Sequence, residues 1–375
     1  MALERNPGIA VAAAQREAAE AGRVTARAYP NPSIEMGGGS SRGRQTGVIN
    51  GNAWAFGLAQ PLEYPGLRGA RSLAAEAGVA SANAGIDVFR VNLTAAVRSA
   101  FYDVLRRQAE AALAGEDTEL LRSVRTRIEV RVQTGEAPRF DLIRADTELL
   151  NATKAQESAV LRVQQAKAAL ARLAGALPRN FEVKGELAPD RPLPSLTAML
   201  EQLLATSPDF ARARAELRQA EARLGLEREL RLPPVTLVAG GDQDPDRRNL
   251  MLGLSVPLPL WNRREGPIAE AVAAVAGARA RVEDLRLALT QDLEIAFQHY
   301  LINQRQVTVF ESGLLRQAEA ALKVAEAAYR FGERGILDYL DAQRTFRSVR
   351  ADYLNARYEL QYARIDIDRL RAVEP

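Results

Sequence analysis

Two short stretches of this sequence carry matched glycine and acidic residues, and they hold the side chains best placed to do chemistry. In one stretch Gly332 is followed by Asp338, and in the other Gly135 is followed by Asp141, in each case 197 positions earlier. Each Gly interrupts a long Ala-rich helical pattern, and each Asp lies in the first turn of the next helical pattern. A carboxylate in that place can accept backbone N–H bonds at the helix start. The sequence therefore predicts two helix–turn–helix tips with acidic residues beside the turn.

The residue types and motifs that the sequence lacks exclude several kinds of functional site. The chain has no Cys, so it contains neither a disulfide scaffold nor a thiolate metal site nor a Cys nucleophile. Its single His, His299, lies in a helical pattern, where a lone His is more often a surface or packing residue than a metal ligand. The phosphate loop G-x-x-x-x-G-K-[ST], the H-E-x-x-H pair and the G-x-S-x-G elbow are all missing. We therefore expect no enzyme activity, no cofactor and no metal.

The charges and the hydropathy limit the possible partners. Lys and Arg number 50 against 47 Asp and Glu, and no block of basic residues suggests a nucleic-acid partner. No apolar run reaches the roughly 18 residues expected of a membrane-spanning helix. The opening residues MALERNPG do not have the pattern of a signal peptide. We expect a protein that either stays in solution or meets a membrane through β-strands.

Large apolar residues alternate with small ones in two segments, about 32–64 and about 235–260. This period of two is typical of a strand that turns one face to lipid or to a core. An ordinary hairpin of a soluble domain is the alternative for either segment alone, but the two segments match at a spacing of 196. Glu35 would then have to face the lumen. The large residues are Trp54, Phe56, Leu58, Leu62 and Tyr64, interrupted by Gln60, and then Leu250, Leu252, Leu254, Val256, Leu258 and Leu260.

These segments belong to an internal repeat of about 196 residues. Residues 177–206 form a crosspiece rich in Pro, with a possible strand at Phe181–Leu187 and a short helix near Leu196–Ala205. The first repeat, 1–176, contains a helix, the strand pair 32–64, a long helix 67–134 and a return helix 138–175. The second, 207–375, contains a helix, the strand pair 235–260, a long helix 268–331 and a return helix 336–372.

The second long helix has a seven-residue apolar repeat, which predicts helices packed along their length as in a coiled coil. Its members are Leu293, Tyr300, Val307, Leu314, Ala321 and Ala328, with Ala318 and Ala325 between them. Four strands cannot close a barrel, and their edges would be exposed. Three chains would pool twelve strands, above the eight that a membrane barrel needs. The predicted fold is therefore mainly α with a small β part: a trimeric α-helical barrel continued by a 12-stranded transmembrane β-barrel.

The motif Tyr329, Gly332, Asp338, Asp341 and Ala342 makes the whole chain resemble a TolC-like outer-membrane factor. The stretch PLPLWNRREGPIAEA, residues 257–271, is most similar to the CzcC-type branch that serves heavy-metal resistance pumps. The resemblance implies a homotrimer in the outer membrane of a Gram-negative bacterium, with most of the chain in the periplasm. Such a duct contacts outer-membrane lipid, docks to a periplasmic adaptor (a membrane fusion protein) and an RND-type inner-membrane pump, and conducts its substrate passively.

The resemblance also assigns roles at the tips. Asp338 and Asp341 would face the lumen as a periplasmic gate, where rings of carboxylates favour cations. Helix capping is the alternative for Asp338. Tyr329 and Arg334 would latch neighbouring tip helices, with Arg334 engaging Asp141. The alternative for Arg334 is a solvated side chain of little consequence.

Aromatic residues flank the predicted strands. Trp54, Tyr64 and Trp261 match the interfacial aromatics of membrane barrels, and ordinary packing is the alternative. Family members often carry a lipid on an N-terminal Cys, so that anchor is either absent or removed here.

Two other functions fit the same patterns. A drug-efflux duct or a type I secretion duct would share the fold, because a wide duct does not need to bind its cargo. A soluble coiled-coil scaffold would also explain the seven-residue repeat. The twin strand pairs, with their matched large faces, argue against the scaffold.

Overall fold

A computed structural model describes residues 2–42, 49–175, 177–178, 180–185 and 193–373. The chain divides into two compact units, and each unit takes segments from both sequence repeats. The first unit comprises Met1–Ala10, Asp87–Pro208 and Arg286–Pro375, and the second comprises Val11–Ile86 and Asp209–Leu285. The repeats are therefore units of sequence and not separately packed bodies.

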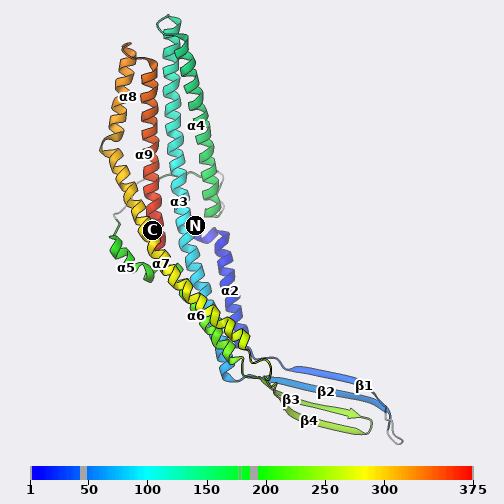
Figure 1. The fold of residues 1–375 in the computed structure, drawn as a ribbon. Coiled ribbons are helices and arrows are strands. Elements are labelled where there is room, and N and C mark those ends of the chain that lie inside the picture. Colours follow the sequence, from blue (N-terminus) through cyan, green and yellow to red (C-terminus); the bar gives the residue numbers. More distant parts are fainter. Residues whose placement is uncertain (1, 43–48, 176, 179, 186–192, 374–375) are drawn as a thin grey trace. The chain divides into compact units, whose positions relative to one another are not determined.

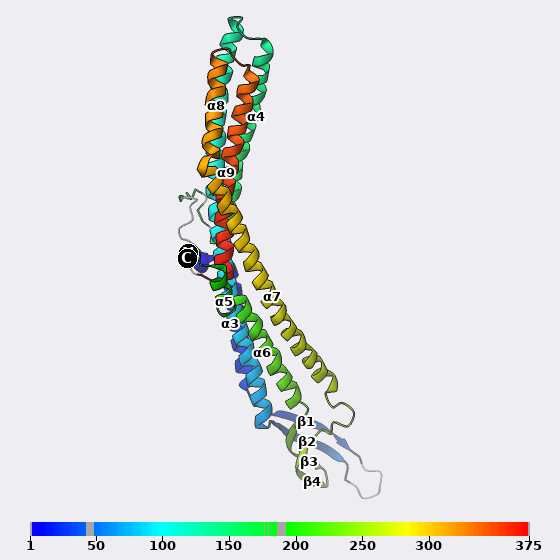
Figure 2. The ribbon, with the colours of Figure 1, turned by 60° about the vertical axis from the view of Figure 1, so that its left-hand side comes forward.

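Two helical hairpins dominate the first unit (Figure 1). The long helix α3 (Pro65–Gln133) runs for 69 residues without a break, about 100 Å at 1.5 Å per residue, and α4 (Arg139–Ala174) returns beside it. The second hairpin consists of α7 (Glu265–Val309), a π-turn η1 (Phe310–Leu314), α8 (Leu315–Arg330) and the return helix α9 (Ile336–Leu370). Residues 65–86 of α3 and 265–285 of α7 belong to the second unit. Figure 2 shows the two hairpins side by side within this unit.

The apolar face of the second hairpin differs from the predicted seven-residue repeat. Leu293 and Tyr300 are buried as predicted, but Leu314 and Ala321 are exposed. Ala318 is buried as predicted, and Ala325 packs against the core as predicted. The prediction is wrong at Leu314 and Ala321: the π-turn adds one residue, and Leu322 and Tyr329 take the core places that the repeat gave to Ala321 and Ala328.

Short segments complete the helical part of the chain. Phe181 and Val183 pack against α3 and α4 in one hydrophobic cluster. The described residues 180–185 form no strand, so the predicted strand is wrong there, and 186–187 lie outside the described residues. The remaining helices are α1 (Ala2–Arg5), α2 (Pro7–Arg27), α5 (Leu196–Thr206) and α6 (Pro208–Glu229).

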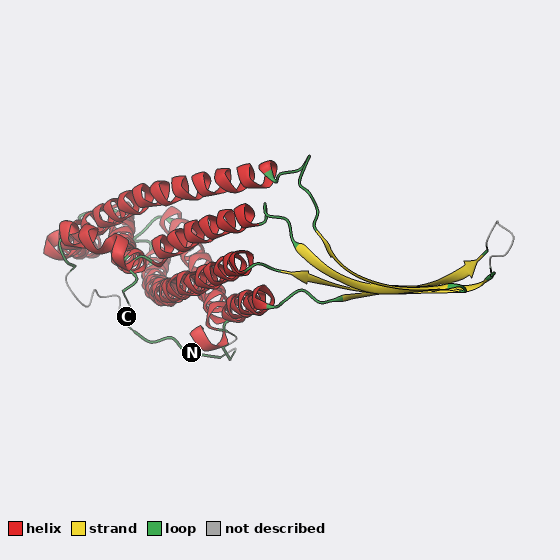
Figure 3. Ribbon diagram, turned by 90° about the horizontal axis from the view of Figure 1, so that it is seen from below, coloured by secondary structure: helices red, strands yellow, loops and turns green. Residues whose placement is uncertain are grey.

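The second unit contains an antiparallel sheet, shown in yellow in Figure 3. Its strand order is β1-β2-β3-β4. The strands are β1 (Ser33–Ser41), β2 (Gly51–Leu62), β3 (Val235–Asp244) and β4 (Arg247–Ser255). The central pairing of β2 with β3 joins the two repeats, with Phe56 opposite Gly241 and Leu58 opposite Ala239. A mainly helical fold with a four-stranded sheet is thus confirmed.

The two faces of the sheet differ strongly. Residues directly opposite each other in neighbouring strands share a face. One face carries the large apolar residues Ile34, Met36, Trp54, Phe56, Leu58, Leu237, Leu250, Leu252 and Leu254, all of them exposed in the single chain. The other face is small or polar, with Glu35, Gly57, Gly240 and Met251 in one row and Ala55, Asp242 and Asn249 in the next. The predicted contrast between large and small faces is confirmed.

The strand ends differ from the predicted ones. The second strand pair turns at residues 245–246, within the predicted segment 235–260. Strand β4 ends at Ser255, because Pro257 and Pro259 lack the N–H that a ladder needs. Gln60 breaks the apolar series for a local reason: its amide donates to the carbonyls of Pro30 and Pro61. Within the described part of the chain, no helix is both long enough and apolar enough to span a membrane.

Candidate gate at the helix tips

The two tip turns have the same backbone geometry. Gly135 and Gly332 have φ angles of +79° and +78°, in the left-handed region that favours Gly. The N–H of Glu136 donates to the carbonyl of Arg131, and the N–H of Glu333 donates to that of Ala328, each five residues back. This pattern satisfies the last carbonyls of the long helix before the chain reverses. The predicted twin tips are therefore present in the structure.

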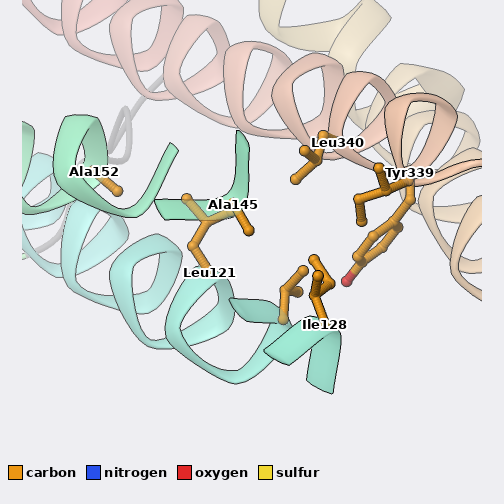
Figure 4. Packing of buried hydrophobic residues seen from close by; sticks show 8 residues of the cluster. Leu121, Ile128, Ala145, Ala152, Tyr339 and Leu340 are labelled. Atoms are coloured by element: carbon orange, nitrogen blue, oxygen red, sulfur yellow. The ribbon is translucent and has the colours of Figure 1, made fainter. Parts of the chain in front are cut away.

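A hydrophobic cluster joins both hairpins just below the tips (Figure 4). Leu121 and Ile128 come from α3, Ala145 from α4, and Tyr339 and Leu340 from α9, and all five are buried. Figure 4 shows the ring of Tyr339 reaching from α9 towards Ile128. The return helices begin at residues 139 and 336. This cluster therefore anchors the two helix starts that carry Asp141 and Asp338.

Tyr329 lies on α8, and its ring contacts residues of α3 and α9 in the same chain. Its ring stacks on that of Tyr339, with centroids 5.9 Å apart and planes 4° from parallel. The guanidinium carbon of Arg131 lies 5.0 Å from the centroid of the Tyr329 ring. The Tyr329 hydroxyl is buried and has no hydrogen-bond partner within the chain. Its ring is therefore positioned by α3 and α9.

Asp338 and Asp341 both lie exposed on the face of α9 opposite the buried residues Ile336 and Tyr339. The Nη1 atom of Arg334 is 3.5 Å from the Oδ2 atom of Asp338, one turn away on the same chain. Both side chains are largely exposed, so this pair contributes little stability. Arg334 partly neutralises Asp338, and the Arg344 guanidinium interacts electrostatically with Asp341, so each carboxylate has an arginine near it.

The predicted contact between Arg334 and Asp141 is not among the contacts within one chain, where Arg334 meets Asp338. Asp141 lies in the first turn of α4, and its backbone N–H bonds the carbonyl of Pro138. The residue at the start of α4, Pro138, provides no side-chain cap. The predicted latch between Arg334 and Asp141 stays a prediction.

One charged residue near the tips escaped the sequence analysis. Asp117 on α3 is only 8% exposed, and it borders a cavity of about 400 Å³ between α3, α4 and α9. Burial raises the pKa of Asp117 to about 6, although Arg347 and Arg350 oppose that rise. The Nε atom of Arg347 lies 3.8 Å from its carboxylate. Its only sequence signal is an Asp in a helix position that also faces the core, and its partners come from the other end of the chain.

Ion pairs tie the two repeats together along the same helices. Glu116 meets Arg350 at 2.8 Å, and Arg127 on α3 meets Glu326 on α8 at 3.2 Å. Farther from the tips, Arg98 on α3 meets Asp368 on α9 at 3.0 Å. These contacts hold the second hairpin against the first within one chain.

The predicted interfacial aromatics differ in their surroundings. Trp54 is half exposed and stacks on Phe56, with ring centroids 6.1 Å apart, on the apolar face of the sheet. Trp261 is 94% exposed beyond the end of β4. The Tyr64 hydroxyl donates to the carbonyl of Glu229, a contact that favours ordinary packing for this residue.

The structure offers no geometry for a bound metal in the residues that it describes. No group of three or more His, Asp or Glu side chains comes together there. His299 is exposed on α7.

Comparison with known proteins identifies the family. The family model described as "Outer membrane efflux protein" matches residues 1–176 and 199–372. The cobalt-zinc-cadmium resistance protein CzcC of Cupriavidus metallidurans is 30% identical over 376 residues, which cover 99% of this chain and 88% of CzcC. The nickel-cobalt-cadmium resistance protein NccC of Alcaligenes xylosoxydans xylosoxydans is 29% identical over 76% of this chain and 65% of NccC.

A solved structure has the same fold. The crystal structure of CusC superposes with a TM-score of 0.85 at 19% sequence identity, covering 99% of this chain and 90% of CusC. Since the family model covers both repeats and CzcC aligns along nearly the whole chain, the protein belongs to the outer membrane efflux protein family and is an outer-membrane protein.

Proposed function

We propose that this chain is the exit duct of a tripartite RND-type efflux system, assembling as a homotrimer that passively conducts heavy-metal cations. Its partners are a periplasmic adaptor, an inner-membrane RND-type pump and the lipid of the outer membrane. The proteins of this family are channels and not enzymes, so the energy comes from the pump.

One observation supports the proposed duct function: the sheet has an exposed apolar face, a small or polar opposite face and two unpaired edges. An exposed apolar face of this kind belongs against lipid or a partner. Strands β1 and β4 each have only one neighbour, so both edges are free to pair with other copies. Three copies joined edge to edge give a closed twelve-stranded barrel with lipid outside and the small, polar face inside.

The cargo is argued from the relatives and from charge. The two relatives named above are, by name, resistance proteins against cobalt, zinc, cadmium and nickel. In a trimer, Asp341 would supply a ring of three carboxylates at the periplasmic entrance, which favours cations. Asp338 would add a second ring, weakened by Arg334 at 3.5 Å. We place the cation-selecting role on the two rings together.

The direct test is metal tolerance. Cells that lack the protein should tolerate less cobalt, zinc and cadmium, and the wild-type gene should restore the tolerance. Unchanged metal tolerance together with a loss of tolerance to drugs would move the assignment to a drug-efflux duct. Recovery of the protein as a soluble monomer without detergent would favour the scaffold alternative.

The gate is tested separately with the Arg334→Ala variant in planar bilayers. The contact of Arg334 within its own chain is weak, so the substitution should change the free energy of unfolding by less than about 0.5 kcal/mol. Loss of a latch to Asp141 of the next chain should raise the single-channel conductance severalfold. Arg139→Ala, at an exposed arginine beside the other tip turn, is the control and should leave conductance as it was. Equal conductance of Arg334→Ala and the wild type would refute the latch.

A further inference from the structure

The two sequence repeats differ in length by one residue within the second long helix. Phe297 and Gln304 follow Phe101 and Gln108 by 196 positions. Closer to the tip the spacing is 197, as Gly332 follows Gly135. The second repeat therefore contains one additional residue between Gln304 and Gly332.

The π-turn η1 lies inside that interval. At Phe310–Leu314 the helix widens, and the N–H of Leu315 bonds the carbonyl of Phe310, five residues back. A π-turn of this kind accommodates one more residue than an α-helical turn. The matching part of the first repeat lies within α3, which is α-helical from Pro65 to Gln133. The additional residue is thus located at η1.

The widened turn absorbs this residue without rotating the helix beyond it. Leu293 and Tyr300 are buried before the turn, and Ala318 is buried after it. Subtracting 196 from the first two gives Val97 and Val104, and subtracting 197 from Ala318 gives Leu121, which all lie in the matching cores of α3. Both long helices therefore keep one continuous apolar face, and the π-turn is a local feature.

The turn is secured by polar side chains on the surface of the hairpin. Arg316 donates to the carbonyl of Ser312 at 2.8 Å. From α9, the hydroxyl of Tyr353 donates to Glu311 at 2.8 Å, and the Tyr353 ring lies 5.8 Å from that of Phe310. No residue of η1 is buried. In Figure 1 the ribbon bends outward from α9 where α7 meets α8.

We propose that the π-turn Phe310–Leu314 is the hinge about which the gate-bearing tip of the second hairpin bends, with Tyr353 as the side chain that holds its resting position. The inference rests on the proposed gate. Because α3 lacks such a turn, bending belongs to the hairpin that carries Tyr329, Asp338 and Asp341. The helix–turn–helix of the first repeat is the rigid counterpart.

Deletion of Ser312 tests the first half of this inference. Removing the additional residue should convert η1 into regular α-helix, so the trimer should fold with a thermal midpoint equal to or above that of the wild type. Deletion of Glu116 in α3 is the matched control. The first repeat contains no additional residue. This deletion should therefore rotate all later core positions by about 100° around the helix axis and lower the thermal midpoint strongly. If both deletions lowered the thermal midpoint equally, the inference that η1 contains an additional residue would be wrong.

Hydrogen exchange tests the hinge without relying on conduction. In the wild type, the amides of 309–316 should exchange faster than those of 113–119, and deletion of Ser312 should slow them to the α3 rate. Equal exchange of the two segments in the wild type would overturn the hinge.

Conductance then links the hinge to the gate. Combining the Ser312 deletion with Arg334→Ala should reverse the conductance gain of Arg334→Ala, whereas Tyr353→Phe alone should raise conductance. Slowed exchange without any change in conductance would overturn the connection to gating. A wild-type trimer that conducts no ions would instead refute the proposed duct, and the exchange result would still decide the hinge.

Discussion

At the scale of single residues, Asp117 is a carboxylate in an unfavourable environment for its charge. Burial opposes its ionised form more than Arg347 and Arg350 favour it, so its pKa rises to about 6 from an ordinary value of 3.8. The folded state therefore holds the proton more tightly than the unfolded chain does. Asp117 contributes most to stability below pH 4, and this contribution is lost as the pH rises from 4 to 6.

We expect Asp117→Asn to stabilise the protein at neutral pH. The amide keeps the shape of the carboxyl group and has no charge to bury, while Arg347 is exposed enough to remain hydrated. The gain at pH 7.5 should be about 1–2 kcal/mol, allowing for water in the adjoining cavity. It should shrink towards zero near pH 4. Thermal unfolding of both proteins between pH 4 and 8 measures the difference.

The neighbouring acid supplies the control. Glu116 is exposed and paired with Arg350, so Glu116→Gln should change stability by less than about 0.5 kcal/mol with little dependence on pH. If Asp117→Asn destabilised the protein by the same amount at every pH between 4 and 8, the ion pair with Arg347 would outweigh the burial of the carboxylate.

At the scale of elements, the two tip turns depend on glycine for the same reason. Alanine at a φ angle near +79° is strained, and nothing else lies within 4 Å of the added Cβ at Gly135 or Gly332. We expect Gly135→Ala and Gly332→Ala each to lower the free energy of unfolding by about 1–2 kcal/mol. Chemical denaturation of the detergent-solubilised protein measures it.

For a glycine inside a helix, substitution by alanine should change the free energy of unfolding in the opposite direction. Gly85 lies inside α3 with open space around its Cα atom, so Gly85→Ala should raise stability by up to about 1 kcal/mol. If all three substitutions changed the free energy of unfolding in the same direction, the effect would come from a property of alanine other than backbone strain at the tips.

Most elements follow from the sequence because their boundaries are chemically marked. Pro7 and Pro138 open helices, and Gly135 and Gly332 end them, so the helix positions were predicted to within a few residues. The seven-residue repeat fails at Leu314 and Ala321, because a periodic pattern cannot reveal where one residue has been added. The repeat spacing of 196 and then 197 did contain that information.

The candidate site was harder to predict, because its contacts join distant parts of the chain. The turns and the acids beside them were visible as a motif. The stacking of Tyr329 on Tyr339 under Arg131 was not, since α3 and α8 are brought together only by the packed core. Asp117 was missed for the same reason, because its partners lie more than 200 residues away.

At the scale of the whole molecule, the sheet makes the proposed assembly testable with two adjacent residues. Leu252 and Met251 are neighbours on β4, both largely exposed, and they lie on opposite faces of the sheet. In the proposed trimer Leu252 faces lipid and Met251 faces the lumen. The same substitution at the two positions should therefore have different consequences.

Leu252→Lys should reduce the amount of trimer in the outer membrane, because a lysine facing lipid costs about 2–4 kcal/mol per chain near the bilayer midplane. Met251→Lys should leave that amount nearly unchanged. It should instead shift the ion selectivity towards anions, because it places three positive charges in the lumen. Quantitative blotting of outer-membrane fractions and reversal potentials in a salt gradient measure the two effects. If Met251→Lys blocked assembly while Leu252→Lys inserted normally, the faces of the sheet would be reversed and the lipid-facing side would be the one that carries Glu35 and Asp242.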